Sequence, residues 1–247
     1  MRILCVIPSR MGSTRTPRKP LLPIHGKPMI QWVYENARLS KIITDVVVAT
    51  DSQEIMDVVA SFGGKALMTS PDFQTGSDRV AAVAKNYEDM DVIINLQGDE
   101  PFIKPTMLET LVQPYLDGQM PCMTTLARPL NLSLSHAEPG AVKVITDLYD
   151  NAIYFSRAPI PYFRVDAFAP VYHHIGLYAF QRDFLLKYTT LSQSPLEKTE
   201  SLEQLRALEH GYKIRVCFTD EDTLEINTPE EYAAAQKFVF QTTSTTL

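Results

Sequence analysis

The segment ILCVIPSRMGSTRTPRKP, residues 3–20, joins an apolar run to a basic loop. The run at residues 3–7 is short, rich in β-branched side chains and free of the polar alternation that marks a half-solvated strand. It therefore predicts a strand of a parallel sheet, buried on both faces. The loop that follows concentrates four cations within ten positions: Arg10, Arg15, Arg18 and Lys19. Such a loop fits either a solvated surface or the binding of an anion.

The composition of the 247-residue chain is that of an ordinary globular protein, with 45% hydrophobic and 21% charged residues. A formal net charge of −6 argues against a broad surface for nucleic acid or for an anionic membrane, so any anion site is local. The chain has no apolar run long enough to span a membrane and no signal-peptide cleavage pattern. Three separated cysteines in apolar runs predict buried free thiols of a cytoplasmic protein: Cys5, Cys122 and Cys217.

Two further apolar runs, at residues 46–49 and 92–96, have the same character as the first. Helical patterns lie at residues 28–39, 53–62 and 77–87, with Pro28 suited to a first helical position. Strands and helices that alternate with short links predict an α/β protein with a doubly wound, mainly parallel sheet.

The middle of the chain predicts further strands, at residues 141–146, 152–156 and 171–180. We expect them to form an antiparallel β insertion over about residues 120–180, within a single domain of residues 1–247. Prolines interrupt residues 157–170, which predict a loop. The remaining expected elements are a helix over 195–210 ended by Gly211, a strand over 213–218 and a last helix from Pro229.

Polar residues follow each of the first three apolar runs, at the edge where open α/β sheets bind ligands. They read PSR at residues 8–10, TD at 50–51 and QGDEP at 97–101. The basic loop matches neither the phosphate loop of ATPases nor the dinucleotide-binding pattern. A polyphosphate nevertheless needs several cations around it, and small residues that let the backbone approach it. Asp99 fits either a ligand of Mg²⁺ or an ordinary turn acid.

Seven segments carry a resemblance to a known family: IPSRMGSTRTPRKPL, VVVATD, MTSPDFQTGSDR, INLQGDEP, YFSRAPIPY, HHIGLYAF and PLEKTESLEQLRALEHG. Together they resemble the bacterial 3-deoxy-manno-octulosonate cytidylyltransferases, also called CMP-Kdo synthetases, from residue 2 to about residue 240. The resemblance implies a fold like that of the nucleotide-diphospho-sugar transferases and a cytoplasmic homodimer. It also implies Mg²⁺-dependent transfer of CMP from CTP to 3-deoxy-D-manno-octulosonate (Kdo), with release of pyrophosphate, for lipopolysaccharide biosynthesis.

The same resemblance assigns the site residues. It implies that the nucleotide is bound by Pro8, Arg10, Ser13, Arg15, Lys19, Ser77, Asp78 and Arg79. It implies that the sugar acid is bound by Gln97, Arg157, His174, Tyr178, Glu200 and Gln204. The implied catalytic residues are Arg10, Lys19 and Asp99, with Asp99 also holding Mg²⁺. Catalysis would consist of positioning and charge neutralisation while the anomeric hydroxyl attacks the α-phosphorus.

Residue spacing predicts that some of these site residues lie on the same face of an element. Glu200 and Gln204 are four apart on a predicted helix, and His174 and Tyr178 are four apart on a predicted strand, so each pair is expected to share a face. Each pair also has a structural interpretation: an exposed helix acid for Glu200 and a hydrogen-bonded core histidine for His174.

Two positions depart from the family pattern. Arg18 replaces a glycine, which implies either backbone strain, if that position needs a positive φ, or an added phosphate contact. Asn227 replaces a metal-binding aspartate and offers an oxygen without a charge. The alternatives that remain are the same reaction on a modified ulosonic acid, such as an 8-amino or sialic-type acid, and an impaired relative that only binds nucleotide.

Glu225 lies two residues before Asn227 and would share its face if the stretch is extended. We expect Glu225 to restore the missing charge of the metal site, directly or through water. Glu225→Ala should then raise the Mg²⁺ concentration needed for activity, and Asn227→Asp should lower it. An unchanged Mg²⁺ requirement in Glu225→Ala would rule the compensation out.

Overall fold

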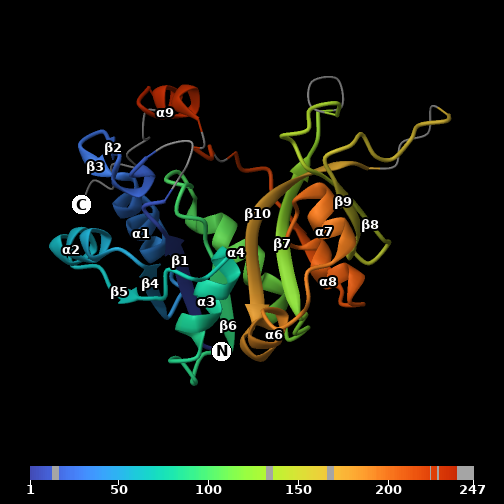
Figure 1. Cartoon of the computed structure of the whole chain (residues 1–247). Coiled ribbons are helices and arrows are strands. Elements are labelled where there is room, and N and C mark those ends of the chain that lie inside the picture. The colour runs from blue at the N-terminus through green and yellow to red at the C-terminus, as the bar shows by residue number, and fades with distance from the viewer. Residues whose placement is uncertain (13–16, 132–135, 166–169, 223, 227, 238–247) are drawn as a thin grey trace, which may run out of the picture.

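Nine strands of the described residues form one sheet in this computed structural model (Figure 1). The structure describes residues 1–12, 17–131, 136–165, 170–222, 224–226 and 228–237. The strands are β1 (Ile3–Ser9), β4 (Asp45–Thr50), β5 (Ala66–Met68), β6 (Val92–Asn95), β7 (Met123–Pro129), β8 (Lys143–Thr146), β9 (Ala152–Ser156), β10 (Tyr172–Gln181) and β11 (Ile214–Phe218). A separate hairpin pairs β2 (Pro23–Ile24) with β3 (Lys27–Pro28).

The strand order is β11-β7-β10-β6-β1-β4-β5, with β8 paired to β10 and β9 paired to β8. The neighbours among β6, β1, β4 and β5 are parallel, and so are β7 and β11. β10 runs antiparallel to β6, β7 and β8, and β9 runs antiparallel to β8. The predicted α/β fold with parallel and antiparallel parts is confirmed, and the antiparallel strands belong to the same sheet as the parallel ones.

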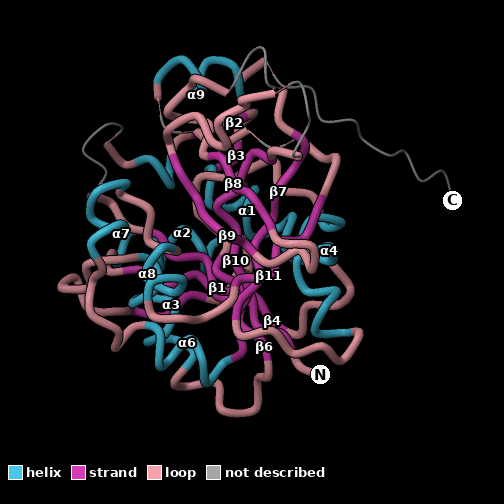
Figure 2. The backbone as a smooth tube through the Cα atoms, turned by 90° about the vertical axis from the view of Figure 1, so that its right-hand side faces the viewer, coloured by secondary structure: helices cyan, strands magenta, loops and turns pink. Residues whose placement is uncertain are grey.

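Helices lie on both sides of the strands (Figure 2). They are η1 (Lys19–Leu21), α1 (Met29–Leu39), α2 (Gln53–Ser61), α3 (Gly76–Ala84), α4 (Pro105–Leu116), α6 (Arg182–Tyr188), α7 (Pro195–Glu200), α8 (Leu205–Glu209) and α9 (Pro229–Ala235). Among these helices, none combines the length and the apolar character that are needed to cross a membrane.

The central strand β1 is buried on both faces, as its continuous apolar run predicts. Ile3, Cys5 and Ile7 belong to the core cluster that includes residues of α1, α2 and α4. The alternate residues Leu4 and Val6 belong to the cluster on the other face, with residues of α3, α6 and α8. Successive side chains of a strand point to opposite faces, so a strand between two helical layers has apolar residues at every position.

The C-terminal segment returns to the hairpin near the start of the chain. A third apolar cluster joins Ile24, Met29 and Phe102 to Ile226 and Ala235. The Tyr232 hydroxyl donates to the Pro23 carbonyl at 2.6 Å, and the Ile226 N–H donates to the Asp99 carbonyl at 3.0 Å. Figure 1 shows α9 beside β2 and β3. The last described residues are therefore fixed to the edge of the sheet where β6 ends.

Two predictions of helix limits are wrong. Pro28 has ψ 142, pairs with Pro23 and precedes α1, so it is not the first helical residue. The helix expected over residues 195–210 is two short helices, α7 and α8, because Ser201 adopts a left-handed conformation with φ 53. The expectation that Glu200 and Gln204 share a helical face therefore fails: Glu200 ends α7 and Gln204 immediately precedes α8.

The three cysteines are free thiols, as predicted, but only two of them are buried as predicted. Cys5 and Cys217 are buried, Cys122 is partly buried, and all three are free thiols. Burial raises the pKa of Cys217 to about 12. Burial also raises the pKa of Cys5, so the thiols of Cys5 and Cys217 are protonated at neutral pH.

Candidate active site

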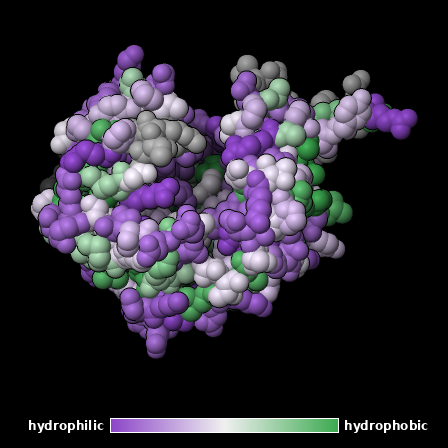
Figure 3. All heavy atoms as spheres, viewed as in Figure 1, coloured by the Kyte–Doolittle hydropathy of each residue, from purple (hydrophilic) through white to green (hydrophobic). Residues whose placement is uncertain are grey.

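A cavity of about 400 Å³ opens where the central strands end. It is lined from three segments of the chain: the loop after β1, the start of α3 and the turn after β6. Its charged lining residues are Arg10, Lys19, Arg79 and Asp99. Pro8 and Gln97 also line it. The space-filling view shows the molecule hollowed between its two halves (Figure 3). The sheet topology thus brings together the strand ends that the sequence singles out.

Two ion pairs hold charged groups in this cavity. Lys19 Nζ lies 2.6 Å from Asp99 Oδ2, and both side chains are largely buried, at 13% and 23% exposure. Arg79 is 4% exposed and contacts Asp51 Oδ2 at 2.8 Å. The second carboxylate oxygen of Asp99, Oδ1, is buried and has no hydrogen-bond partner within the described part of the chain. A buried oxygen in this state is costly unless a ligand or a cation satisfies it.

Gly98 allows the ends of β1 and β6 to approach each other. A Cβ atom at this position would lie 3.1 Å from the Pro8 carbonyl oxygen and 3.6 Å from Ser9 Oγ. A larger residue would therefore require a shift of a few tenths of an ångström between the end of β1 and the turn that carries Asp99. The glycine permits the close approach of these two segments.

A smaller cavity of about 90 Å³ adjoins the first, because Gly76 and Gln97 line both. Four residues assigned from the sequence meet in its lining: Ser77, Gln97, Tyr178 and Gln204. The sequence assignment did not include the other lining residues, among them the polar Asn95 and Glu203. Within the described residues, Asn95 Oδ1, Glu203 Oε1 and Gln204 Nε2 are buried without hydrogen-bond partners. The small cavity thus presents two acceptors and one donor to a ligand rich in hydroxyl groups.

Glu203 is the acid that sequence spacing overlooked. Burial is the main reason why its pKa lies above the ordinary value for a glutamate, and Ser77 and Arg206 oppose that effect. The i, i+4 rule favoured Glu200 as the partner of Gln204, because it assumed a continuous helix. Because the helix is interrupted at Ser201, Glu203 lines the small cavity and Glu200 does not. No local signal in the sequence marks that break, since serine has no strong preference for a left-handed backbone.

His174 and Tyr178 share a face of β10, as predicted. Their rings lie 5.6 Å apart although the pairing of β10 with β7 slips between Ile175 and Tyr178. Tyr178 lines the small cavity, whereas His174 lines neither cavity. His174 is buried, with Nε2 3.0 Å from Thr125 Oγ1. The Thr125 hydroxyl also contacts the Leu177 carbonyl at 2.9 Å, and its one hydrogen goes there. It therefore accepts from His174, whose Nε2 carries the proton.

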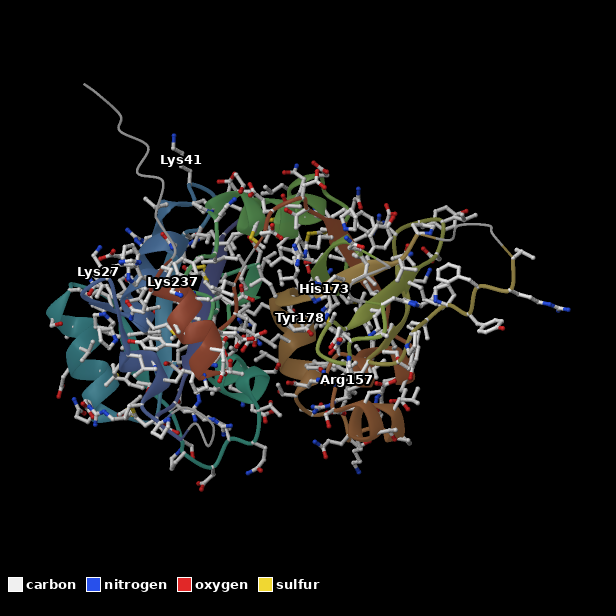
Figure 4. The ribbon with its side chains drawn as sticks, turned by 90° about the horizontal axis from the view of Figure 1, so that it is seen from above. Lys27, Lys41, Arg157, His173, Tyr178 and Lys237 are labelled. Atoms are coloured by element: carbon white, nitrogen blue, oxygen red, sulfur yellow. The ribbon has the colours of Figure 1, made fainter. Side chains whose placement is uncertain are left out.

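Arg157 and Glu200 line neither cavity and form a separate network. Glu200 accepts from Ser156 Oγ at 2.6 Å and from the Arg157 N–H at 2.9 Å. Lys143, fully buried, donates from Nζ to the Arg157 carbonyl at 2.6 Å. Burial of Glu200 opposes its ionisation, but the bonds from Ser156 and Arg157 hold its pKa below the ordinary value. In Figure 4, Tyr178 lies near the middle of the molecule and Arg157 lies beside the orange helices. Glu200 and Lys143 thus fix the Arg157 backbone.

The backbone at Arg18 has the left-handed conformation that the family's glycine suggests, with φ 58 and ψ 25. The guanidinium forms an ion pair with Glu54 in α2 and does not line the large cavity. The sequence implied either backbone strain or an added phosphate contact at Arg18. The structure shows backbone strain, since a non-glycine residue has a positive φ.

The other assigned residues are placed as follows. Asp78 caps α3, where it accepts from the Thr75 N–H at 3.1 Å, and it lines neither cavity. Glu225 is exposed in the segment between β11 and α9. Ser13, Arg15 and Asn227 lie outside the described residues. Among the residues that the structure covers, no three or more His, Cys, Asp or Glu side chains cluster as a metal site.

The family profile described as cytidylyltransferase matches residues 4–214 of the chain. A 3-deoxy-manno-octulosonate cytidylyltransferase of Acaryochloris marina is 54% identical over 241 residues, which is 98% of this chain and 98% of the relative. The chain belongs to the 3-deoxy-manno-octulosonate cytidylyltransferase family. The family resemblance inferred from the seven sequence segments is therefore confirmed.

Two further relatives of this family bear on the site. A solved structure of a CMP:2-keto-3-deoxy-manno-octonic acid synthetase complexed with CTP matches with a TM-score of 0.90 and 42% identity. The match covers 96% of this chain and 100% of the solved one. An 8-amino-3,8-dideoxy-manno-octulosonate cytidylyltransferase of Shewanella sediminis is 46% identical, covering 94% of this chain and 96% of the relative. The family thus includes a protein named for an amino sugar acid.

The burial of His174 predicts a pH-dependent stability. Burial lowers its pKa to about 3, compared with 6.5 for an unperturbed histidine. The unfolded chain therefore binds a proton that the folded chain does not, and stability falls as the pH drops from about 6.5 towards 3. When the pH falls from 7 to 5, the free energy of unfolding should decrease by about 2 kcal/mol less in His174→Gln than in the wild type. Urea denaturation at the two pH values measures this difference.

The exposed His210 provides the control for this measurement. His210→Gln should keep the pH dependence of the wild type. Equal losses in His174→Gln and in the wild type would show that the imidazole of His174 is not held neutral by the fold.

Proposed function

We propose that this protein transfers CMP from CTP to the anomeric hydroxyl of Kdo and releases pyrophosphate, a step of lipopolysaccharide biosynthesis. One observation carries the proposal: a large cavity lined by Arg10, Lys19, Arg79 and Asp99 adjoins a small cavity with unsatisfied polar atoms. The first matches the charge of a nucleoside triphosphate, and the second matches the hydroxyl groups of a sugar acid. The CTP complex of the relative at 42% identity supports the same assignment.

In this proposal the large cavity holds CTP. Arg10 and Lys19 neutralise the charge that develops on the α-phosphate and on the departing pyrophosphate. Arg79, oriented by Asp51, lies on the side of the cavity formed by α3. Ser13 and Arg15 stay predicted members of the same clamp, and Asp78 supports it by capping α3.

The small cavity holds part of the sugar acid. Its junction with the large cavity at Gln97 takes the reacting end, because the anomeric oxygen must reach the α-phosphorus. Its far wall takes hydroxyl groups: Glu203 accepts from one and Gln204 donates to another. Tyr178 forms part of the wall between them. Arg157, His174 and Glu200 line neither cavity. We propose that they affect sugar binding indirectly, by supporting the residues that form this wall.

The residues present fit a magnesium ion at Asp99. Mg²⁺ takes one or two carboxylates together with substrate phosphates and waters, and Asp99 Oδ1 is a buried oxygen without a partner in the described structure. We propose that Asp99 holds the ion, with Asn227 and Glu225 as the predicted further ligands. When bound, Mg²⁺ neutralises phosphate charge and orients the triphosphate.

The reaction requires the protein to align the anomeric oxygen with the α-phosphorus and the departing pyrophosphate. The new bond joins the anomeric oxygen to the α-phosphorus, the bond from phosphorus to the bridging oxygen breaks, and pyrophosphate leaves with the electron pair. The hydroxyl proton passes to solvent water. Gln97 lies where the two cavities meet and orients the sugar acid, while Lys19 stays fixed against Asp99. No covalent intermediate with the protein is needed.

The assembly proposed is a homodimer in the cytoplasm, built from one domain with an insertion at residues 120–180. Large apolar side chains are exposed on the β8–β9 hairpin and the loop after β9: Leu148, Tyr149, Ile153, Tyr162 and Val165. Large apolar side chains that stay exposed on one insertion are candidates for burial at a protein interface. We propose that a second copy of the chain covers them.

A second candidate substrate is an ulosonic acid that carries an amino group. The buried carboxyl of Glu203 can accept from a hydroxyl or pair with an ammonium, and one family member is named for the 8-amino acid. Both candidates share the nucleotide site and the reaction.

The function is tested by pyrophosphate release with CTP, Mg²⁺ and a panel of ulosonic acids. Lys19→Ala should lower kcat/KM about 100-fold or more, because it removes a cation from the developing phosphate charge. Lys41→Ala, which removes an exposed lysine, should leave the rate unchanged. Binding of CTP without pyrophosphate release for any acid would contradict the enzyme assignment and support an impaired relative.

The role of Glu203 is tested by Glu203→Gln. We expect the KM for the sugar acid to rise about 10-fold, because a buried hydrogen bond to the ligand is weakened, while the KM for CTP stays the same. Glu88→Gln, at an exposed glutamate, should change neither constant. A larger effect on an 8-amino acid than on Kdo would identify the amino sugar as the substrate. A rise in the KM for CTP alone would place Glu203 outside the sugar site.

A further inference from the structure

The loop that carries Lys19 turns sharply at the residue before it. Arg18 has φ 58, and its carbonyl accepts the Leu21 N–H at 2.9 Å. Lys19 begins η1, and its carbonyl accepts the Leu22 N–H at 3.2 Å. This turn fixes the backbone of Lys19 in one conformation.

The side chains of Arg18 and Lys19 make different contacts. Lys19 points into the large cavity, where Nζ pairs with Asp99. Arg18 is 59% exposed and pairs with Glu54, which is 46% exposed and lies in the first turn of α2. With this left-handed backbone at Arg18, the Lys19 side chain reaches the turn after β6 and the Arg18 side chain reaches α2, the helix that follows β4.

The Arg18–Glu54 contact joins the loop that lines the large cavity to α2, a helix that does not itself line it. α2 starts just after Asp51, and Asp51 holds Arg79 at the cavity wall. Lys19 is therefore anchored from both sides: its own side chain reaches Asp99, and its neighbour reaches α2. The contact also removes Arg18 from the set of groups that touch the cavity.

We infer that the Arg18–Glu54 ion pair is a positioning contact that ties the loop after β1 to α2 and holds Lys19 in place for the nucleotide. This inference rests on the proposed binding of CTP in the large cavity. It explains why an arginine is accommodated where glycine suits the backbone better: its side chain supplies an anchor that glycine lacks.

The test compares CTP affinity, measured by calorimetry, in Arg18→Gly, Glu54→Ala and the double variant. Glycine accepts φ 58 without strain, so Arg18→Gly removes the side chain and keeps the turn. Each single variant should bind CTP about 3- to 5-fold more weakly, since an exposed ion pair is worth little. The double variant should bind no more weakly than either single one, because both remove the same contact. The charge-reversed pair, Arg18→Glu with Glu54→Arg, should recover affinity.

A matched control separates this contact from a general loss of positive charge. Arg2 forms an exposed ion pair with Asp89 on the opposite edge of the sheet, at 51% exposure. Arg2→Ala should leave CTP affinity unchanged. If instead Glu54→Ala keeps or improves CTP affinity while Arg18→Gly weakens it, Arg18 binds phosphate directly and the inference is overturned.

A second measurement does not depend on CTP. Hydrogen exchange at the Leu21 and Leu22 amides should be faster in Arg18→Gly and in Glu54→Ala than in the wild type, without any ligand. Unchanged exchange in both variants would overturn the inference even if CTP binds. Failure of the wild type to bind CTP would contradict the proposed function, and the exchange rates would still decide whether the pair holds the loop.

Discussion

The ion pair between Lys19 and Asp99 is the contact on which the active site depends. It joins the loop after β1 to the turn after β6, two segments from neighbouring parallel strands. Most of both side chains is buried, so the pair is poorly screened by water, and its attraction is stronger than at the surface. Gly98 permits the close approach of the ends of these two strands. A polar, charged edge can form here only because the apolar strands behind it place their ends side by side.

The sheet supports this edge with two independent layers of packing. Alternate residues of β1 contribute to separate clusters on its two faces, so the strand is held from both sides. This packing supports a site that keeps polar atoms without hydrogen-bond partners among the described residues, such as Asp99 Oδ1 and Glu203 Oε1. Unsatisfied buried atoms cost about 1–3 kcal/mol each, and a well-packed core provides the stability that tolerates them.

Much of the fold is visible in the sequence, because strands buried on both faces have continuous β-branched runs. The runs that became β1, β4 and β6 predict both the sheet and the edge where the cavity lies. β7 was missed since Thr124 and Thr125 interrupt its apolar pattern; both are fully buried and bond to backbone carbonyls. α4, with Pro114 inside it, and α6 and β5, which are short, were missed as well.

Site residues were predicted from the family resemblance and from their place after the strands of the sheet. Arg10, Lys19 and Asp99 lie in the segments that follow β1 and β6, and the structure brings them together. Glu203 was hidden, because its direction depends on a left-handed residue that no pattern marks. The partner of Arg18 was hidden as well, since Glu54 belongs to a different βα unit and meets Arg18 only in the folded sheet.

The attachment of the C-terminal segment has a consequence for how the protein is made. Ile226 bonds to the backbone of Asp99, and α9 packs on the hairpin that follows the basic loop. During synthesis β1, β4 and β6 leave the ribosome well before these residues exist, so the central strands can pair early. The contact between Ile226 and the Asp99 backbone forms later, once residues 226–235 have been made. A nascent chain that ends before residue 224 therefore has the central strands but lacks the contact that holds the turn at Asp99 to the C-terminal segment.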